Sequence, residues 1–179
     1  EFMKADKKNN SENIQVKQHN EFFNINSKYI LNCAGLNSIE ISKKINKNIK
    51  LPLPNPVKGS YLRYDKPSPI NHIIYPSILP GEIKERTDAV PSINGGLRFG
   101  PSIDETNSID DFSIDKNLID RFYKNIKIYM PKIDINDLKL DLAGIRPRVF
   151  TEDDKNPDFY VREEESGFIN LIGIESPGL

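Results

Sequence analysis

Two arginines in the second half of the chain have the chemistry and spacing of a carboxylate-binding site. Arg146 and Arg148 stand two residues apart in the sequence Ile145-Arg146-Pro147-Arg148. In an extended segment, residues at positions i and i+2 point to the same side, so both guanidinium groups could face one ligand. A guanidinium matches the two oxygens of a carboxylate with a pair of hydrogen bonds. The alternative is that they pair with an acidic side chain of the protein and have only a structural role.

Standard catalytic and nucleotide-binding patterns are missing from the sequence. It contains no G-x-G-x-x-G fingerprint, no Walker loop and no ordered set of Ser, His and Asp. The glycine-rich residues 95–100 lie between two predicted strands, which favours a hairpin. The two histidines, His19 and His72, are too few for a His-rich metal site, and no metal is expected. The single cysteine, Cys33, lies in an apolar run and is predicted to be an inert core thiol.

Charge and hydropathy exclude several classes of protein. The 25 Lys and Arg residues almost balance the 26 Asp and Glu residues, so there is no basic footprint for nucleic acid. No apolar run approaches the ~18 residues of a membrane-spanning helix, and the start has no secretory signal. One cysteine rules out an internal disulfide and fits a reducing compartment, so a cytoplasmic location is expected.

The first part of the chain is predicted to pass from a polar end into a strand and a helix. Residues 1–3 resemble a vector remnant, and residues 4–13 are predicted to be a mobile end. Residues 28–34 form a continuous apolar run, which predicts a buried and parallel strand. Ser38 is expected to cap the N-terminus of the helix that follows.

Proline and glycine divide the remainder into strands and one long helix. The Pro-rich residues 51–56 indicate a domain crossover, and Asn-Gly-Gly at 94–96 predicts a hairpin. Apolar residues at spacings of three and four predict an amphipathic helix over residues 115–130, with a short helix at 134–140. The acidic residues 163–165 are expected to form an exposed connection. Strands are predicted at residues 14–16, 21–25, 57–64, 70–77, 89–93, 97–100, 142–149, 159–162 and 168–174.

Several short motifs follow one another in an order that resembles a known family. They are Leu31-Asn32-Cys33-Ala34-Gly35-Leu36-Asn37-Ser38, Val57-Lys58-Gly59-Ser60-Tyr61, Ile74-Tyr75-Pro76, Leu97-Arg98-Phe99-Gly100-Pro101, and Ala143-Gly144-Ile145-Arg146-Pro147-Arg148 with Gly173-Ile174-Glu175-Ser176-Pro177-Gly178-Leu179. Together they resemble FAD-dependent oxidoreductases of the D-amino-acid-oxidase superfamily. Within it they are most similar to the L-2-hydroxyglutarate dehydrogenase/oxidase branch. The resemblance covers roughly residues 25 to 179.

The resemblance implies an α+β or α/β fold, in which a mixed-sheet substrate domain with a long helix accompanies part of a Rossmann-type FAD-binding domain. It implies a partial FAD-binding domain at residues 1–50, a substrate-binding domain at 51–150 and a truncated return to the FAD-binding domain at 151–179. FAD is the expected cofactor. Because the fingerprint that holds its pyrophosphate is missing, this piece alone is expected to be inactive. A separate Rossmann chain is a possible partner.

The resemblance also implies roles for single residues. Arg146 would hold the carboxylate of the substrate, Tyr61 would orient the substrate, and Tyr75 is a weaker candidate for the same contact. Asp88 stands where many relatives carry a histidine, so it is the candidate general base. Tyr61 is the second candidate catalytic residue. Backbone of two segments would contact the cofactor, namely Ala34, Gly35, Gly173, Ile174, Glu175, Ser176, Pro177, Gly178 and Leu179.

The implied reaction is oxidation of a 2-hydroxy acid such as L-2-hydroxyglutarate, by hydride transfer to FAD, as part of a larger or split protein. An FAD-dependent amino-acid oxidase is the alternative enzyme, because both chemistries use the same scaffold. The alternative outside enzymology is a non-catalytic fragment, decayed or separately encoded, that acts as a binding piece. The missing fingerprint and Asp88 in place of histidine favour this last hypothesis.

Overall fold

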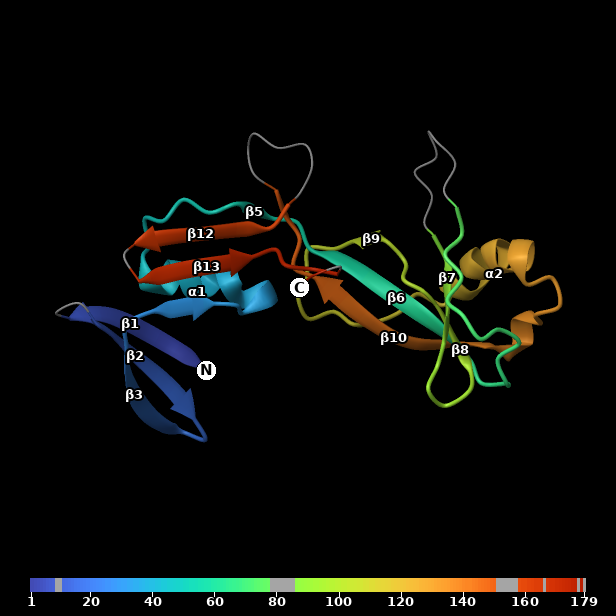
Figure 1. Cartoon of the computed structure of the whole chain (residues 1–179), viewed down its shortest axis with the longest axis horizontal. Coiled ribbons are helices and arrows are strands. Elements are labelled where there is room, and N and C mark those ends of the chain that lie inside the picture. The colour runs from blue at the N-terminus through green and yellow to red at the C-terminus, as the bar shows by residue number, and fades with distance from the viewer. Residues whose placement is uncertain (9–10, 78–85, 151–157, 166, 177, 179) are drawn as a thin grey trace. The chain divides into compact units, whose positions relative to one another are not determined.

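The chain folds into two compact units (Figure 1). A computed structural model describes residues 1–8, 11–77, 86–150, 158–165, 167–176 and 178. Unit 1 combines residues 1–56 with residues 146–179, and unit 2 consists of residues 57–145. In the described ranges, each unit contains antiparallel sheet and one α-helix, so the expected mixed α+β class is confirmed.

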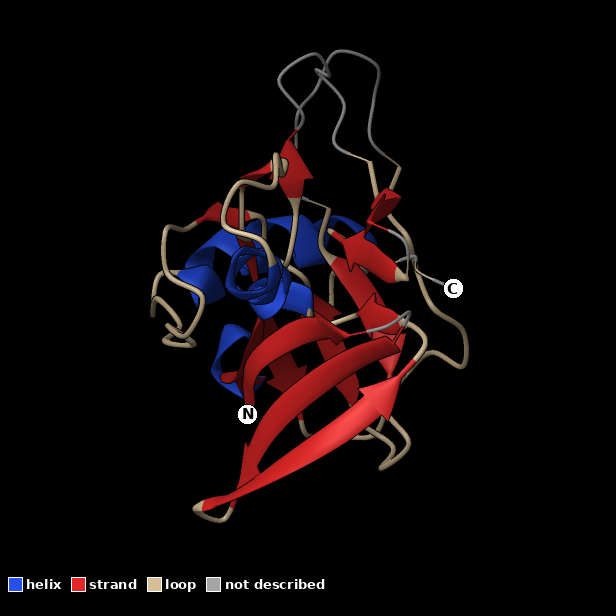
Figure 2. Ribbon diagram, turned by 90° about the vertical axis from the view of Figure 1, so that its left-hand side faces the viewer, coloured by secondary structure: helices blue, strands red, loops and turns tan. Residues whose placement is uncertain are grey.

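Unit 1 begins with an antiparallel meander, whose second and third strands the sequence predicted at residues 14–16 and 21–25 and whose first strand it did not. Its strands are β1 (Phe2–Lys8), β2 (Ser11–Gln18) and β3 (Glu21–Ser27), and Figure 2 shows them as three long twisted strands. Residues 4–8 and 11–13 belong to β1 and β2, so the prediction of a mobile end is wrong there, while the origin of residues 1–3 stays a prediction. The turn between β2 and β3 has positive φ at His19 and Asn20, 47° and 68°, as two-residue hairpin turns favour.

A second sheet in unit 1 has the strand order β12-β13-β4. Its strands are β4 (Ile30–Asn32), β12 (Tyr160–Glu165) and β13 (Phe168–Ile172). The predicted parallel strand is confirmed, since Ile30 of β4 lies opposite Phe168 of the parallel β13. The predicted acidic connection is wrong, because residues 163–165 belong to β12. The Glu164 carboxylate accepts hydrogen bonds from Tyr160 and Asn170, which holds it in the sheet.

Short helices follow β4. They are the 3₁₀-helix η1 (Gly35–Asn37) and α1 (Ser38–Ile45), and farther on β5 (Leu53–Pro54) pairs with β11 (Val149–Phe150). Asn37 occupies the N-cap position of α1, so the prediction for Ser38 is wrong by one residue. Ser38 is buried instead, and its hydroxyl has no hydrogen-bond partner in the described part of the chain. Cys33 is exposed because β4 ends before it, so it is no core thiol.

Buried amides and hydroxyls join α1 to the parallel strands. Asn32 and Asn170 are register partners, and Nδ2 of Asn32 donates to Oδ1 of Asn170 at 2.8 Å. Ser42 of α1 donates from Oγ to the same oxygen at 2.7 Å. All three residues are buried. A shift of one residue would separate these partners, so the network fixes the register of β4 against β13.

Unit 2 is built on a sheet with the order β10-β6-β8-β7, with β9 paired to β6. Its elements are β6 (Val57–Tyr64), β7 (Asp88–Pro91), β8 (Leu97–Gly100), β9 (Asp104–Glu105), α2 (Leu118–Tyr129), the 3₁₀-helix η2 (Ile135–Asp137) and β10 (Leu138–Arg146). The hairpin at 94–96 and the long helix are confirmed. The strand predicted at 70–77 is wrong, since the structure has only one bridge, between Ile74 and Ala89. The helix predicted at 134–140 is reduced to η2.

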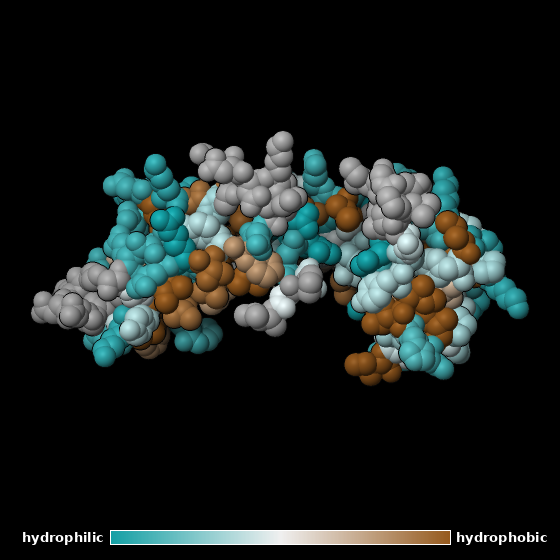
Figure 3. Space-filling model, turned by 45° about the horizontal axis from the view of Figure 1, so that its top comes forward, coloured by the Kyte–Doolittle hydropathy of each residue, from teal (hydrophilic) through white to brown (hydrophobic). Residues whose placement is uncertain are grey.

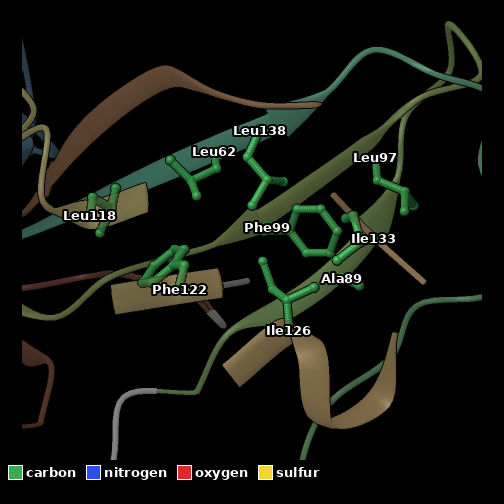
Figure 4. Packing of buried hydrophobic residues seen from close by; sticks show 9 residues of the cluster. All are labelled: Leu62, Ala89, Leu97, Phe99, Leu118, Phe122, Ile126, Ile133 and Leu138. Atoms are coloured by element: carbon green, nitrogen blue, oxygen red, sulfur yellow. The ribbon is translucent and has the colours of Figure 1, made fainter. Parts of the chain in front are cut away.

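Helix α2 covers one face of this sheet with its apolar side. Leu118, Phe122 and Ile126 follow one another at four-residue spacing and are buried. Figure 4 shows them directed toward Leu62 of β6 and Phe99 of β8. Among the described residues, no second α-helix of unit 2 covers the opposite face of the sheet. Side chains that alternate with Leu62 and Phe99 point to this face, called the open face here, where Asp88 is buried and Arg63 is exposed.

Apolar residues also remain on the surface. On the side that Figure 3 shows, they gather in separate patches among hydrophilic residues. Phe22 and Phe23 of β3 are exposed, as is Leu31 of β4. Within the described ranges, no helix has the length and apolar content to cross a membrane.

Candidate functional site

Two segments that the sequence marks as cofactor contacts lie at the same edge of a sheet in unit 1. Because β4 and β13 are parallel, their carboxyl ends lie at the same edge. Ala34 and Gly35 follow β4, and residues 173–176 follow β13. In open parallel sheets, ligands bind in the crevice outside the carboxyl ends of the strands. The parallel pairing therefore creates a candidate cofactor edge, defined by Ala34, Gly35 and residues 173–176.

Gly35 and Gly173 shape the turns of this edge. Both have positive φ, 57° and 77°, which glycine adopts without strain. At Gly35 a Cβ atom would meet nothing within 4 Å, so a ligand has room beside the backbone. At Gly173 a Cβ atom would lie 2.8 Å from Cγ2 of Val149. The turn after β13 thus packs closely on β11, while the turn after β4 is open.

Glu175 at the cofactor edge lies between the two arginines of the Arg-Pro-Arg motif. Arg148 donates from Nε to Oε1 of Glu175 at 2.8 Å, and its Nη2 lies 2.7 Å from the same oxygen. Arg146 forms a longer ion pair, with Nη1 3.5 Å from Oε2. In the described part of the chain, this buried Oε2 accepts no hydrogen bond. Arg148 is thus the main partner of Glu175, and carboxylate binding by Arg146 stays a prediction.

The open face of the unit 2 sheet carries Tyr61 and Asp88 in one row. Leu62 and Ala89 both pair with Phe99 on the core side. The adjacent row, Tyr61, Gly100 and Asp88, must therefore face the opposite side. Gly100 contributes no side chain, and a Cβ atom there would lie 2.9 Å from Cδ1 of Tyr61. The Tyr61 ring thus packs over the backbone of Gly100, and Asp88 belongs to the same row.

Asp88 is buried and paired with a cation. Nε of Arg86 lies 2.6 Å from Oδ1, and Nη2 donates to Oδ2 at 3.3 Å. Burial raises the pKa of the Asp88 carboxyl, although the hydrogen bond and charge of Arg86 act in the opposite direction. The short contact to Oδ1 lacks the alignment of a hydrogen bond. A carboxylate with a raised pKa holds a proton more strongly, which suits a general base.

Arg86 connects Asp88 with Tyr75, and the sequence reasoning missed it. Its guanidinium lies 4.8 Å from the centroid of the Tyr75 ring, in the geometry of a cation–π contact. Two predicted site residues therefore share one partner. The spacing of Arg86 and Asp88 at i and i+2 was a usable signal, because such residues lie on one side of a strand. The contact with Tyr75 had no signal, since it depends on how residues 70–77 fold.

The remaining predicted site residues fall into unit 1. Ile174 is half-buried, whereas Ser176 and Gly178 are exposed. Pro177 and Leu179 lie outside the described residues. Among residues that the structure describes, no group of three or more His, Cys, Asp or Glu side chains is arranged to hold a metal ion.

Comparison with protein families finds a match over nearly the whole chain. The model of the DAO family, described as FAD dependent oxidoreductase, matches residues 5–179. The mitochondrial L-2-hydroxyglutarate dehydrogenase of Arabidopsis thaliana is 29% identical over 167 residues, covering 84% of this chain and 34% of that protein. The glycerol 3-phosphate dehydrogenase of Caloramator mitchellensis is 29% identical over 164 residues, covering 86% of this chain and 31% of that protein. The chain thus spans about a third of the length of these curated relatives.

A solved structure shares the fold. The L-alpha-glycerophosphate oxidase of Mycoplasma pneumoniae, determined with FAD bound, superposes with a TM-score of 0.75 at 18% sequence identity. The match covers 99% of this chain and 46% of that one. This likeness supports the fold of the two units described above.

Proposed function

Since the chain belongs to the DAO family of FAD dependent oxidoreductases, we propose that it takes part in oxidising a small 2-hydroxy acid such as L-2-hydroxyglutarate. In this proposal, unit 1 contributes part of the FAD-binding domain and unit 2 contributes the substrate-binding sheet. The 29% identity to an L-2-hydroxyglutarate dehydrogenase supports this choice of substrate. The similar identity to a glycerol 3-phosphate dehydrogenase makes another hydroxyl-bearing anion the main competitor.

The candidate cofactor edge has features that suit FAD. When bound, FAD supplies the two-electron acceptor for the C–H bond that is oxidised. The turn at Gly35 leaves space beside the backbone, and the segment after β13 offers backbone N–H groups at the same edge. The missing G-x-G-x-x-G pattern means that these residues suit one part of the cofactor and not its pyrophosphate. A separate Rossmann chain that supplies the remainder belongs to the proposal as a possible partner.

Each proposed catalytic residue has a defined task. Arg146 binds the carboxylate of the substrate through guanidinium N–H groups that its long ion pair with Glu175 does not occupy. Tyr61 hydrogen-bonds the substrate and orients it. Asp88 takes the proton of the substrate hydroxyl, and burial strengthens it as a base because burial raises its pKa. Tyr75 contributes by holding Arg86 beside Asp88.

One observation carries the proposal, namely the row of Tyr61, Gly100 and Asp88 on the open face of the unit 2 sheet. The Tyr61 ring packs over Gly100, so a substrate beside this ring would meet a phenol and a buried carboxylate of the same row. The core on the opposite face fixes the register that creates this row. An ordinary structural sheet has no need for a buried aspartate on its open face.

The test measures binding and chemistry separately. The purified chain, alone and co-expressed with a Rossmann protein, is titrated with FAD and followed by flavin absorbance. The FAD-loaded sample is then mixed without oxygen with L-2-hydroxyglutarate, glycerol 3-phosphate or an amino acid. We expect L-2-hydroxyglutarate to bleach the flavin fastest. If an amino acid bleached the flavin fastest, the substrate would be an amino acid and not a 2-hydroxy acid. A chain that binds no FAD, alone or with a co-expressed Rossmann protein, would support the non-catalytic alternative.

Replacing the proposed carboxylate ligand gives the sharper result. Arg146→Ala should raise the activation free energy of bleaching by carboxylate substrates by about 1.5–3 kcal/mol, because the substrate carboxylate loses hydrogen bonds from a charged, half-buried partner. The affinity for FAD should change far less. Arg162→Ala is the matched control, since Arg162 is a mostly exposed arginine of the same unit, 4.0 Å from Glu164. Equal losses of turnover and FAD binding in Arg146→Ala would show that Arg146 has a structural role.

A further inference from the structure

Two arginines face each other directly on the open face of unit 2. Arg63 of β6 and Arg98 of β8 are register partners in the antiparallel pair. They alternate with Leu62 and Phe99, which are buried under α2, so both point to the face that carries Tyr61 and Asp88. Like charges directly opposite each other destabilise an antiparallel sheet. This arrangement therefore calls for a negative partner.

The carboxylates nearby neutralise this pair only in part. Arg98 donates from Nε to Oδ2 of Asp141 at 2.6 Å. Nε of Arg63 lies 3.5 Å from Oδ2 of Asp65, and Nζ of Lys139 lies 3.3 Å from the same oxygen. Among the described residues, these three cations thus share two carboxylates, which leaves one positive charge in excess. The side chains of Arg63 and Arg98 are 49% and 43% exposed, so a dissolved anion can reach them.

The arginines border a hollow of about 300 Å³. Ser92 and Asn94, from the hairpin between β7 and β8, line it together with Arg63, Arg98 and Asp141. A hydroxyl, an amide and two guanidinium groups can all donate hydrogen bonds to an anion. Pockets for small molecules begin at about this volume. The hollow is therefore large enough for an anionic group of a small substrate.

The distance along the sheet relates this hollow to the proposed reaction. The row of Tyr61, Gly100 and Asp88 is two residues away from the row of Arg63 and Arg98, or ~7 Å by the rise of a strand. We propose that Arg63 and Arg98 bind the second anionic group, a carboxylate or a phosphate, of a substrate whose hydroxyl-bearing carbon lies beside Tyr61 and Asp88. The proposal rests on the function proposed above. It makes the two arginines the residues that select dianionic over monoanionic substrates.

Binding to the chain itself tests this site without turnover. Glutarate and glycerol 3-phosphate are titrated calorimetrically against butyrate, which lacks a second charge. Arg63→Gln and Arg98→Gln should each weaken glutarate binding by about tenfold or more, as expected for a lost hydrogen bond between charged groups, and leave butyrate unaffected. The glutarate and glycerol 3-phosphate arms show whether carboxylate or phosphate is preferred.

A variant that should strengthen glutarate binding shows whether Arg98 binds a ligand or only forms a structural ion pair with Asp141. Asp141→Asn removes the carboxylate that competes for Arg98, so it should strengthen glutarate binding. If the network were only structural, Asp141→Asn and Arg98→Gln would change binding in the same direction. Arg121→Gln is the matched control, because Arg121 is 45% exposed and pairs with Asp104, away from the hollow. It should leave glutarate affinity unchanged.

The outcomes also separate this site from the proposed reaction. Glutarate binding that is unchanged in both arginine variants, or absent from the wild-type chain, overturns the inference. Equal flavin bleaching by L-2-hydroxyglutarate in the wild type and in an Arg63→Gln/Arg98→Gln double variant overturns it as well, while the proposed oxidation stands. Arginine-dependent glutarate binding without bleaching by any 2-hydroxy acid supports the anion site and rejects the proposed oxidation.

Discussion

The interiors of the two units are filled in different ways. In unit 2, Leu62, Phe99, Phe122 and Ile126 belong to one continuous cluster of buried apolar side chains between sheet and helix. In unit 1, the contact between α1 and the parallel strands is made by a network of polar side chains around Asn170. Both units leave large apolar residues exposed, for example Phe22 and Leu31 in unit 1 and Ile93, Phe112 and Ile128 in unit 2.

This difference indicates how each unit is stabilised. A continuous apolar core supplies free energy of folding in proportion to its buried area, so unit 2 contains what an independent domain needs. A polar network gives less net stability, since its hydrogen bonds replace bonds to water, but it strongly determines which strands pair and in which register. Parallel strands are normally covered on both faces, yet Leu31 of β4 is 59% exposed. Unit 1 should therefore be the less stable of the two.

The largest effect is expected from removing an aromatic residue of the apolar core. Phe99→Ala should lower the free energy of unfolding of unit 2 by about 3–5 kcal/mol, because it removes a fully buried ring and leaves a cavity. Hydrogen–deuterium exchange at increasing urea concentrations measures the free energy of unfolding of each unit separately. Ile128→Ala on the exposed side of α2, 83% accessible, should have almost no effect. Similar losses from both changes would contradict a core located between α2 and the sheet.

A smaller effect is expected from breaking the polar network. Asn170→Ala removes the buried oxygen that accepts from both Asn32 and Ser42, which keep the backbone oxygen of Ser38 as an acceptor. The loss of these two hydrogen bonds should cost about 1–3 kcal/mol. The loss should appear in β4, β13 and α1 by hydrogen exchange and leave unit 2 unaffected. Asn26→Ala is the control, because its hydrogen bond with Asn13 is exposed. A loss of protection in unit 2 as large as in unit 1 would show that the units do not unfold separately.

Gly173→Ala tests the close packing at the cofactor edge. Its φ of 77° costs an alanine about 1–2 kcal/mol, and Val149 must also move to admit a methyl group. Thermal unfolding and FAD titration should both show the change. Gly144→Ala should be neutral, since Gly144 has no positive φ and no atom within 4 Å of a Cβ position. Equal stability of the two variants would remove the argument that this turn requires glycine.

The smallest effect concerns Asp88, a buried carboxylate in the unit that otherwise has an apolar core. Burial raises its pKa above the ordinary 3.8, so the folded state holds the proton more tightly than the unfolded state. Its contribution to stability is therefore present below about pH 4 and is lost as the pH rises through the folded pKa. In Asp88→Asn, the urea concentration at the midpoint of unfolding should fall less with rising pH than it does in the wild type.

Asp111 supplies the contrasting control for that measurement. Hydrogen bonds from Ser113, with help from Lys58, lower the pKa of Asp111 to about 2. Its contribution is present above the ordinary pKa and is lost as the pH falls toward 2, the opposite direction from Asp88. The same pH slope in Asp88→Asn and Asp111→Asn would show that burial does not control Asp88.

Local signals in the sequence predicted the elements whose structure depends on near neighbours. The four-residue spacing of Leu118, Phe122 and Ile126 predicted α2, and Asn-Gly-Gly predicted the β7–β8 hairpin. Strand β1 was missed because its residues Lys4, Asp6 and Lys8 are polar, and its pairing depends on β2. The strand predicted at 70–77 is wrong because strand formation also depends on a pairing partner. Its apolar residues favour a strand, but in the described part of the chain they pair only through the bridge between Ile74 and Ala89.

By itself, the sequence determined the family motifs, the positions of Gly35 and Gly173, and the Arg-Pro-Arg spacing, because these are properties of adjacent residues. The tertiary structure alone decided that Asp88 shares Arg86 with Tyr75 and that Arg63 lies opposite Arg98. These partners come from strands far apart in the chain, and cross-strand register brings them together. Register depends on which face of each strand the core buries, so it emerges only once the sheet is assembled.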